Sequence, residues 1–329
     1  MSLAGVTTMV TGAGGFVGSH LVEWLLDQGA RVRAFLRYTS EASLGNLAEL
    51  GPERRAAVEC VFGDIRDPGA VAEAMEGQEV VFHLAALIAI PYSYAHPREV
   101  VETNVTGTLN VLEAARRHSP RRVVHLSTSE VYGTAQFVPI TELHPQQGQS
   151  PYSASKIAAD RVAESYHRCF GVPVVTVRPF NIFGPRQSQR AVIPTIVSQA
   201  LAGGPVRLGA LTPTRDFTFV TDTAAGIGTA GHAAGVEGRE VNLGSGREIS
   251  VGDLARRAIE RCGTGAEVVS TEDRLRPARS EVNRLVADNS RAASLLGWGP
   301  TVPLDDGLDR TIEWVRAHPE RFCPSEYRR

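Results

Sequence analysis

Short apolar runs alternate with amphipathic stretches through the first two-thirds of the chain. The apolar runs are rich in valine and apolar on both faces, which is typical of strands that helices cover on both sides. We expect strands at residues 6–10, 31–36, 57–63, 80–83, 123–127 and 172–178, and helices between them, such as 17–28 and 108–117. Strands that alternate with helices of this length predict right-handed βαβ units and a parallel sheet.

The pattern changes after Asn181. Glycine and proline interrupt residues 184–216, and helical patterns at 251–262 and 307–317 dominate the remainder. We therefore expect an α/β protein in two parts. Residues 1–180, with about 216–246, form a Rossmann doubly wound parallel sheet that binds a dinucleotide, and about 181–215 and 247–329 form a smaller mixed α/β substrate lobe.

Composition narrows the class of protein. Hydrophobic residues make up 43% and charged residues 21%, as in ordinary globular proteins, and the net charge of −2 argues against nucleic acid as a partner. The four cysteines lack the spacing of a metal site or of a disulfide framework. His83 and His125 lie in apolar strands and are expected to be core histidines rather than ligands. Without a signal peptide or a run of about 18 apolar residues, we expect a cytoplasmic protein with no membrane partner.

The segment after the first predicted strand holds Gly12, Gly15 and Gly18 in the pattern G-x-x-G-x-x-G. Glycines at these positions allow a tight turn, close approach of the backbone to a pyrophosphate, and packing of the following helix on the strand. The amide groups at the start of that helix favour an anion. Because the pattern follows a strand and opens a helix, it predicts a dinucleotide site.

The end of the second predicted strand bears on which dinucleotide is bound. A carboxylate there would bind a free ribose 2′-hydroxyl, but the sequence has Arg37 and Ser40 instead, which suit a 2′-phosphate. We therefore expect NADP, with NAD as the alternative in which Arg37 is simply a solvated strand end. Asp64 and Ile65, after the third strand, are placed to touch the adenine.

Tyr152 and Lys156 are four residues apart in a predicted helix that begins near Ser150, so they share one helical face. A lysine ammonium beside a phenol lowers the pKa of the phenol. Such a tyrosine can take the proton of a sugar hydroxyl while the carbon gives hydride to the nicotinamide. Taken alone, this spacing is also common in solvated pairs on helix surfaces.

Several phrases occur in an order that resembles one family. They are TGAGGFVG, HLAA, NVTGT, STSEVYG, YSASK, RPFNIFGPR, RDFTFV and NLGSG. Together they resemble the extended short-chain dehydrogenase/reductase family that modifies nucleotide sugars, over nearly the whole chain. The resemblance implies a Rossmann lobe, a small sugar-nucleotide lobe and a homodimer formed by a four-helix bundle. It also implies further cofactor contacts, alongside Tyr152 and Lys156, from Phe16, Val17, Leu84, Ala85, Ala86, Asn104 and Pro179.

The phrase STSEVYG bears on the reaction. In this resemblance, the hydroxyl of Thr128 serves 4-epimerases and 4,6-dehydratases alike, whereas a glutamate at Glu130 removes the C5 proton in dehydratases. Oxidation at C4 acidifies that proton, so a carboxylate can start loss of the C6 hydroxyl and hydride can return to C6. Ser129 stands where dTDP-glucose dehydratases have an aspartic acid. It is similar to the serine of GDP-mannose 4,6-dehydratases and of enzymes that act on UDP- or GDP-N-acetylglucosamine, and it leaves the general acid unassigned.

Longer phrases, among them AFLRYTS, LAALIAIPYSY and RLRPARSEVNRLVADN, are similar to the N-acetylglucosamine group and predict a UDP-N-acetylglucosamine 4,6-dehydratase. The resemblance implies that Asn181, Arg215 and Arg276 contact the diphosphate region. It also implies that Ser93 and Arg190 contact the substrate and that Val206 and Leu208 pack against the base. The alternatives are a UDP-glucuronate decarboxylase, a 4-epimerase in which Glu130 is idle, and an NADP-sensing regulator without turnover.

Overall fold

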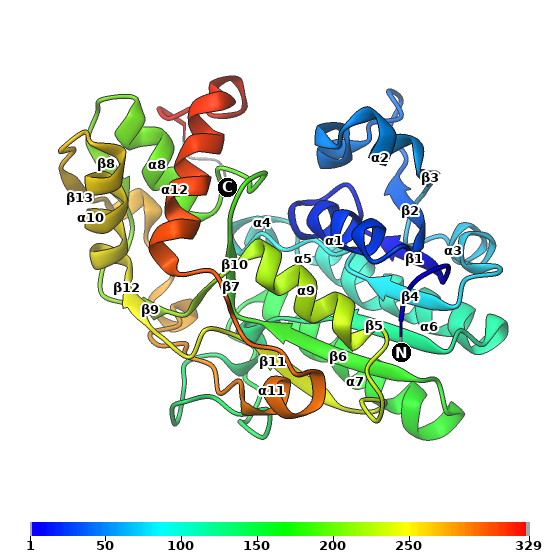
Figure 1. Cartoon of the computed structure of the whole chain (residues 1–329). Coiled ribbons are helices and arrows are strands. Elements are labelled where there is room, and N and C mark those ends of the chain that lie inside the picture. Colours follow the sequence, from blue (N-terminus) through cyan, green and yellow to red (C-terminus); the bar gives the residue numbers. More distant parts are fainter. Residues whose placement is uncertain (1, 327–329) are drawn as a thin grey trace.

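The computed structural model describes residues 2–326 and is built around one seven-stranded sheet (Figure 1). Its strands are β1 (Thr7–Thr11), β2 (Arg31–Arg37), β3 (Val58–Gly63), β4 (Val80–His83), β5 (Arg122–Leu126), β6 (Val174–Pro179) and β11 (Glu240–Leu243). They lie in the order β3-β2-β1-β4-β5-β6-β11, and every neighbouring pair is parallel. The predicted Rossmann doubly wound sheet is therefore confirmed. The six strands expected before residue 180 are all present, with ends that differ by at most two residues.

Helices cover both faces of this sheet. On one face α1 (Phe16–Asp27) packs against α9 (Val220–Ala230). The other face carries α3 (Pro68–Met75), α6 (Gly107–His118) and α7 (Pro151–Phe170), which pack in that order. This double cover explains why the strands are apolar on both faces.

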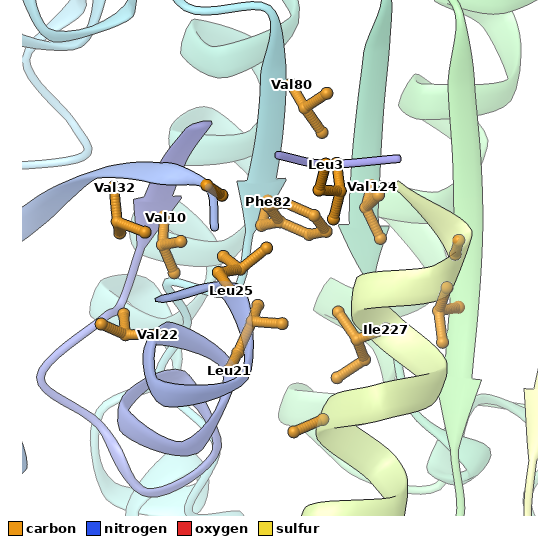
Figure 2. Close-up of a cluster of buried hydrophobic side chains, with 14 of the residues drawn as sticks. Leu3, Val10, Leu21, Val22, Leu25, Val32, Val80, Phe82, Val124 and Ile227 are labelled. Atoms are coloured by element: carbon orange, nitrogen blue, oxygen red, sulfur yellow. The ribbon is translucent and has the colours of Figure 1, made fainter. Parts of the chain in front are cut away.

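Figure 2 shows the hydrophobic core beneath α1 and α9. Val10 and Phe82 project from the sheet toward Leu21 of α1 and Ile227 of α9, and all four side chains are fully buried. Burying a side chain of this size contributes about 1.5–3 kcal/mol. A second cluster, on the opposite face, joins the sheet to α3, α6 and α7.

A second group of elements lies beside the sheet, on the left of Figure 1. The helices α8 (Val192–Leu201), α10 (Val251–Cys262) and α12 (Leu304–Ala317) surround a separate hydrophobic core. Its small sheets pair β8 (Val206–Leu208) with β13 (Val268–Ser270), β9 (Thr214–Arg215) with β12 (Ile249–Ser250), and β7 (Asn181–Phe183) with β10 (Phe217–Phe219). The helix α8 was not expected from the glycine- and proline-interrupted sequence, and α12 begins at Leu304 rather than at residue 307.

Short helices connect these elements. They are α2 (Pro52–Ala56), α4 (Ile90–Ala95), α5 (Pro97–Val101) and α11 (Ser290–Leu296), the 3-10 helices η1 (Gly45–Glu49), η3 (Ser129–Tyr132), η4 (Glu272–Arg274), η5 (Ala278–Ser280) and η6 (Pro319–Arg321), and the π-helix η2 (Glu102–Thr106). Over residues 2–326 we find no helix with the length and apolarity to cross a membrane.

The carboxyl ends of β1, β4, β5 and β6 open onto one edge of the sheet. Gly12, Leu84 and Ser127 follow the first three of these strands, and Pro179 ends the fourth. In open parallel sheets this edge, at the point where the strand order reverses, is where ligands bind. The fold therefore brings the predicted cofactor and catalytic segments to one place.

Candidate active site

The glycine-rich turn between β1 and α1 has no room for side chains. Gly12 has a φ of +71°, and a Cβ there would lie 2.8 Å from the amide nitrogen of Ala85. A Cβ on Gly18 would overlap the carbonyl oxygen of Gly12, so the third glycine is what lets α1 pack against the turn. Gly15, the exposed N-cap of α1, is extended and leaves the start of the helix open.

The start of α1 fits the pyrophosphate of a dinucleotide. Phe16 and Val17 form its first turn and are only partly buried. Amide groups in a first helical turn lack partners within the helix and carry the positive end of its dipole. The helix therefore offers donors and a favourable field to an anion that approaches over the glycines.

We expect Gly18→Ala to destabilise the protein by about 1–3 kcal/mol, the usual cost of overpacking, and to weaken dinucleotide binding. The added methyl group would have to displace either α1 or the turn at Gly12. Denaturant unfolding and calorimetric titration of the dinucleotide measure the two effects. Gly51→Ala is the matched control, since a Cβ there meets nothing within 4 Å. Equal stability of the two variants would contradict the prediction.

The segment 84–86 forms the wall opposite the glycines. The hydroxyl oxygen of Thr11 accepts hydrogen bonds from the amides of Leu84 and Ala85, each at 3.1 Å, and so ties this segment to β1. Asn104 is buried, and its side chain bonds to both backbone groups of Leu87 and to the hydroxyl of Ser155. In this structure Asn104 therefore shapes the loop beside the predicted cofactor site and anchors it to α7.

Of the four residues predicted to bind the adenosine, two are exposed to solvent and two contact other residues of the protein. Arg37 and Ser40 are exposed beyond β2. The carboxylate of Asp64 accepts hydrogen bonds from Arg66 Nε at 2.9 Å and Nη2 at 2.6 Å, and these bonds lower the pKa of Asp64. Ile65 belongs to the hydrophobic core. Arg37 and Ser40 thus remain open to a ligand, while Asp64 and Ile65 are engaged with their neighbours.

The helix α7 begins where the predicted catalytic pair requires it. Ser150 caps the helix, its hydroxyl oxygen accepting from the amide of Ser153 at 3.1 Å, and Pro151 occupies the first helical position. Tyr152 therefore lies in the first turn, where the helix dipole favours a negative charge such as a phenolate. The tyrosine is 6% exposed.

Tyr152 lies close to the residues predicted to act with it. The hydroxyl of Thr128 hydrogen-bonds to the phenol, and the carboxylate of Glu130 is near enough for its charge to act on the phenol and on Arg215. Thr128 also caps η3 by accepting from the amide of Glu130, and Ser129 beside it is buried. The structure thus places the predicted residues Thr128 and Glu130 near the phenol.

Burial dominates the pKa values of Tyr152 and Lys156 in this structure. Burial raises the pKa of Tyr152 well above its ordinary value; the Thr128 hydroxyl opposes this shift, and the charge of Glu130 adds to it. Lys156 donates instead to the carbonyl oxygen of Leu126 at 2.8 Å, and burial lowers the pKa of Lys156 to about 8. Burial is therefore the largest influence on both groups in this structure, and the action of Lys156 on the phenol during the reaction stays a prediction.

Two predicted diphosphate arginines, Arg215 and Arg276, converge on Glu281. Arg215 Nη2 donates to Glu281 Oε1 at 3.2 Å, and Arg276 Nη1 lies 3.8 Å from the same oxygen. Among the residues that the structure describes, this Arg276 nitrogen is buried and has no hydrogen-bond partner. Guanidinium groups bind phosphates through paired hydrogen bonds, so this cluster can hold a diphosphate.

Other predicted substrate residues are placed differently. The hydroxyl of Ser93 is buried and bonds within α4, and Val206 and Leu208 are buried in the second hydrophobic core. Arg190 is exposed to solvent. Asn181 keeps a buried side-chain oxygen without a hydrogen-bond partner among the described residues. Of these five, Asn181 offers the clearest free polar group.

One residue behind Lys156, Asp160, was not predicted from the sequence. His83 is buried and bonds to Thr11 and Thr108, as expected of a core histidine. His125 is also buried, but it bonds to Asp160, which the sequence analysis passed over. The available signal was spacing, because Asp160 follows Lys156 by one helical turn.

Comparison with known proteins gives four matches to one family. Residues 9–311 match the family model described as GDP-mannose 4,6 dehydratase. The chain is 35% identical over 319 residues to a dTDP-glucose 4,6-dehydratase from Actinoplanes sp., and 36% identical over 319 residues to a UDP-glucose 4-epimerase from Mycolicibacterium smegmatis; each alignment covers 94% of this chain and 98% of the relative. The crystal structure of DesIV, a dTDP-glucose 4,6-dehydratase from Streptomyces venezuelae with NAD and TYD bound, superposes with a TM-score of 0.85 at 33% identity, covering 96% of this chain and 98% of that one. Dehydratases and epimerases thus match at similar levels.

Proposed function

Because the chain belongs to the extended short-chain dehydrogenase/reductase family of nucleotide-sugar 4,6-dehydratases and 4-epimerases, we propose that it is a 4,6-dehydratase in which Glu130 is the base. As a member of this family, it is a nicotinamide-dependent enzyme that modifies a nucleotide sugar. The observation that carries the dehydratase proposal is the position of the Glu130 carboxylate, whose charge acts on both Tyr152 and Arg215. A 4-epimerase leaves the C5 proton of its substrate in place and needs no carboxylate base there.

The proposed steps follow from this arrangement. A dinucleotide held by the glycine turn would accept the hydride that leaves C4 of the sugar. Tyr152 takes the proton of the C4 hydroxyl while Thr128 orients the phenol. Glu130 then takes the C5 proton, which the new C4 ketone has made acidic. The protonated Glu130 gives a proton to the C6 hydroxyl, which leaves as water. Arg215 and Arg276 hold the diphosphate throughout.

We propose UDP-N-acetylglucosamine as the substrate. The similarity of several long phrases to enzymes of that sugar supports the choice. The loop at 87–90 is apolar where GDP-mannose dehydratases carry polar residues, and Ile88 within it is 63% exposed. An exposed apolar side chain beside the site can cover the methyl of an N-acetyl group.

The test is turnover in deuterated water with NMR detection. UDP-N-acetylglucosamine should give a 4-keto-6-deoxy product with deuterium at C5, because a solvent proton is added there as hydride returns to C6. A C4 epimer without label at C5 would overturn the dehydratase proposal, and carbon dioxide from UDP-glucuronate would identify a decarboxylase. Turnover of dTDP-glucose, GDP-mannose or UDP-glucose alone would keep the reaction and reject the proposed sugar.

We propose NADP as the preferred cofactor, supported by the exposed Arg37 and Ser40. Arg37→Asp should weaken NADP binding by about 10- to 100-fold, the worth of a hydrogen bond between charged groups, and should strengthen NAD binding. Calorimetric titration of both dinucleotides measures the change. Arg31→Asp, at the other end of β2, is the control. Equal affinity of the unaltered protein for NADP and NAD would reject the preference.

We also propose a homodimer in which α6 and α7 of two copies form a four-helix bundle. The exposed side chains of Leu109 on α6 and Phe170 on α7, with Val101 on α5, support this arrangement. Apolar side chains that gather on helices are commonly covered by a partner. Light scattering of the protein and of Leu109→Glu tests it, since the variant should dissociate to monomers.

A further inference from the structure

Lys156 is the only lysine among the 34 lysine and arginine residues of the chain. It is 3% exposed, and its ammonium donates to the carbonyl oxygen of Leu126. One carbonyl does not balance a full positive charge, and burying an unpaired ammonium is costly. A buried lysine of this kind needs a carboxylate nearby to remain charged.

Asp160 supplies that carboxylate from the same helix. It follows Lys156 by four residues, which places both on one face of α7, and it is also 3% exposed. Its Oδ1 accepts from His125 Nε2 at 3.1 Å, and its Oδ2 accepts from Arg178 Nε at 3.0 Å. Although burial opposes ionisation, the His125 hydrogen bond and the charge of Arg178 lower the pKa of Asp160 to about 2. The carboxylate is therefore fixed and ionised.

Among the charged groups near Lys156, Asp160 is the anion whose charge acts on the ammonium. The groups around Lys156 and Asp160 are Tyr152 on α7, His83 on β4, His125 on β5 and Arg178 on β6, with Glu240 of β11 3.7 Å from Arg178. Burial lowers the pKa of both histidines, so they are neutral near pH 7. The charge of Asp160 raises the pKa of Lys156 against the lowering by burial.

We propose that Asp160 is a positioning residue for the reaction, whose carboxylate, held by Arg178 and His125, keeps Lys156 charged one turn behind Tyr152. The inference rests on the proposed function, because Tyr152 acts as a base only as a phenolate, and a charged Lys156 stabilises that form. A cation on this face of the helix stabilises the Tyr152 phenolate, the form of the side chain that accepts the proton of the C4 hydroxyl. Without Asp160 the lysine is neutral at the working pH and that stabilisation is lost.

The single lysine makes the proposal directly measurable. Protein grown with lysine labelled at Cε and Nζ gives one side-chain NMR signal, and Lys156→Arg, which removes the signal, assigns it. In the wild type the signal should titrate near the value of about 8 that burial imposes. In Asp160→Asn the titration should move about one to three pH units lower, as expected on removing an opposite charge. The alkaline limb of the kcat profile should move in the same direction by the same amount.

Asp222→Asn is the matched control. Asp222 is a buried carboxylate on α9 that accepts from the amides of Thr301 and Val302, away from the site. Its loss should lower stability and leave the lysine titration unchanged. Asp160→Glu, which retains the charge, should restore the lysine titration toward the wild type. Should Asp160→Asn not fold, Asp160→Ser removes the same charge with a smaller side chain and carries the same expectation.

An unchanged lysine titration in Asp160→Asn would overturn the inference whatever the activity. If no nucleotide sugar is turned over, the proposed function fails while the NMR titration still reports on Asp160. If turnover is confirmed and only the lysine titration is insensitive to Asp160, the inference alone fails. The two proposals are thereby tested separately.

Discussion

Tyr152→Phe is expected to lower kcat by about 10²- to 10⁴-fold, the usual contribution of a positioned general acid or base. The substitution removes only the phenolic hydroxyl, and the ring still fills its buried place at the start of α7. Binding of the dinucleotide and of the nucleotide sugar should therefore persist, because Arg215, Arg276 and the glycine turn are untouched. Steady-state kinetics and calorimetric titration separate the two effects.

A second tyrosine on the same helix provides the control. Tyr166 is similarly buried, and its hydroxyl donates to Glu113, far along α7 from the site. Tyr166→Phe should retain nearly full turnover with some loss of stability. If Tyr152→Phe lost no more activity than Tyr166→Phe, Tyr152 could not be the group that moves the C4 proton.

The sequence was sufficient for the parallel sheet and for the cofactor turn. Valine-rich runs bounded by helical patterns have few other solutions, so all six early strands lie close to their predicted bounds. The glycines were informative because the turn requires them for a local steric reason. A Cβ on Gly18 would overlap the carbonyl oxygen of Gly12. The helix α8 was missed because glycine and proline near it were read as interruptions of the whole segment.

The chemistry of the site was less accessible, because it depends on burial and on contacts distant in the sequence. Helical spacing placed Tyr152 and Lys156 on one face, but it could not show that the ammonium points to the Leu126 carbonyl. Resemblance proposed Ser93 and Leu208 as substrate contacts, yet neighbouring atoms enclose both. Arg215 and Arg276 meet at Glu281 only after the chain has folded. Residue type therefore indicated what a side chain can do, and packing decided whether it is free to do it.

Glu130→Gln is expected to reduce formation of the 4-keto-6-deoxy product by about 10²- to 10⁴-fold, since the C5 proton then has no base. Tyr152 and Thr128 remain, so oxidation at C4 should survive, and mixing with substrate should still produce the absorbance of reduced nicotinamide. Exchange of the C5 proton with deuterated water should disappear along with product. NMR of the sugar and stopped-flow absorbance measure these steps independently.

This variant also decides between the two activities of the family. In a 4-epimerase hydride leaves and returns at C4, so an amide at position 130 should leave interconversion of the C4 epimers intact. In the proposed dehydratase the same variant stops after the first oxidation. Glu130→Asp keeps a carboxylate on a shorter side chain and should retain part of the elimination, which shows that the charge, rather than the packing of Glu130, is required. The Tyr152 variant cannot make this distinction, because both reactions begin with its proton transfer, and so the assignment of the reaction depends on Glu130.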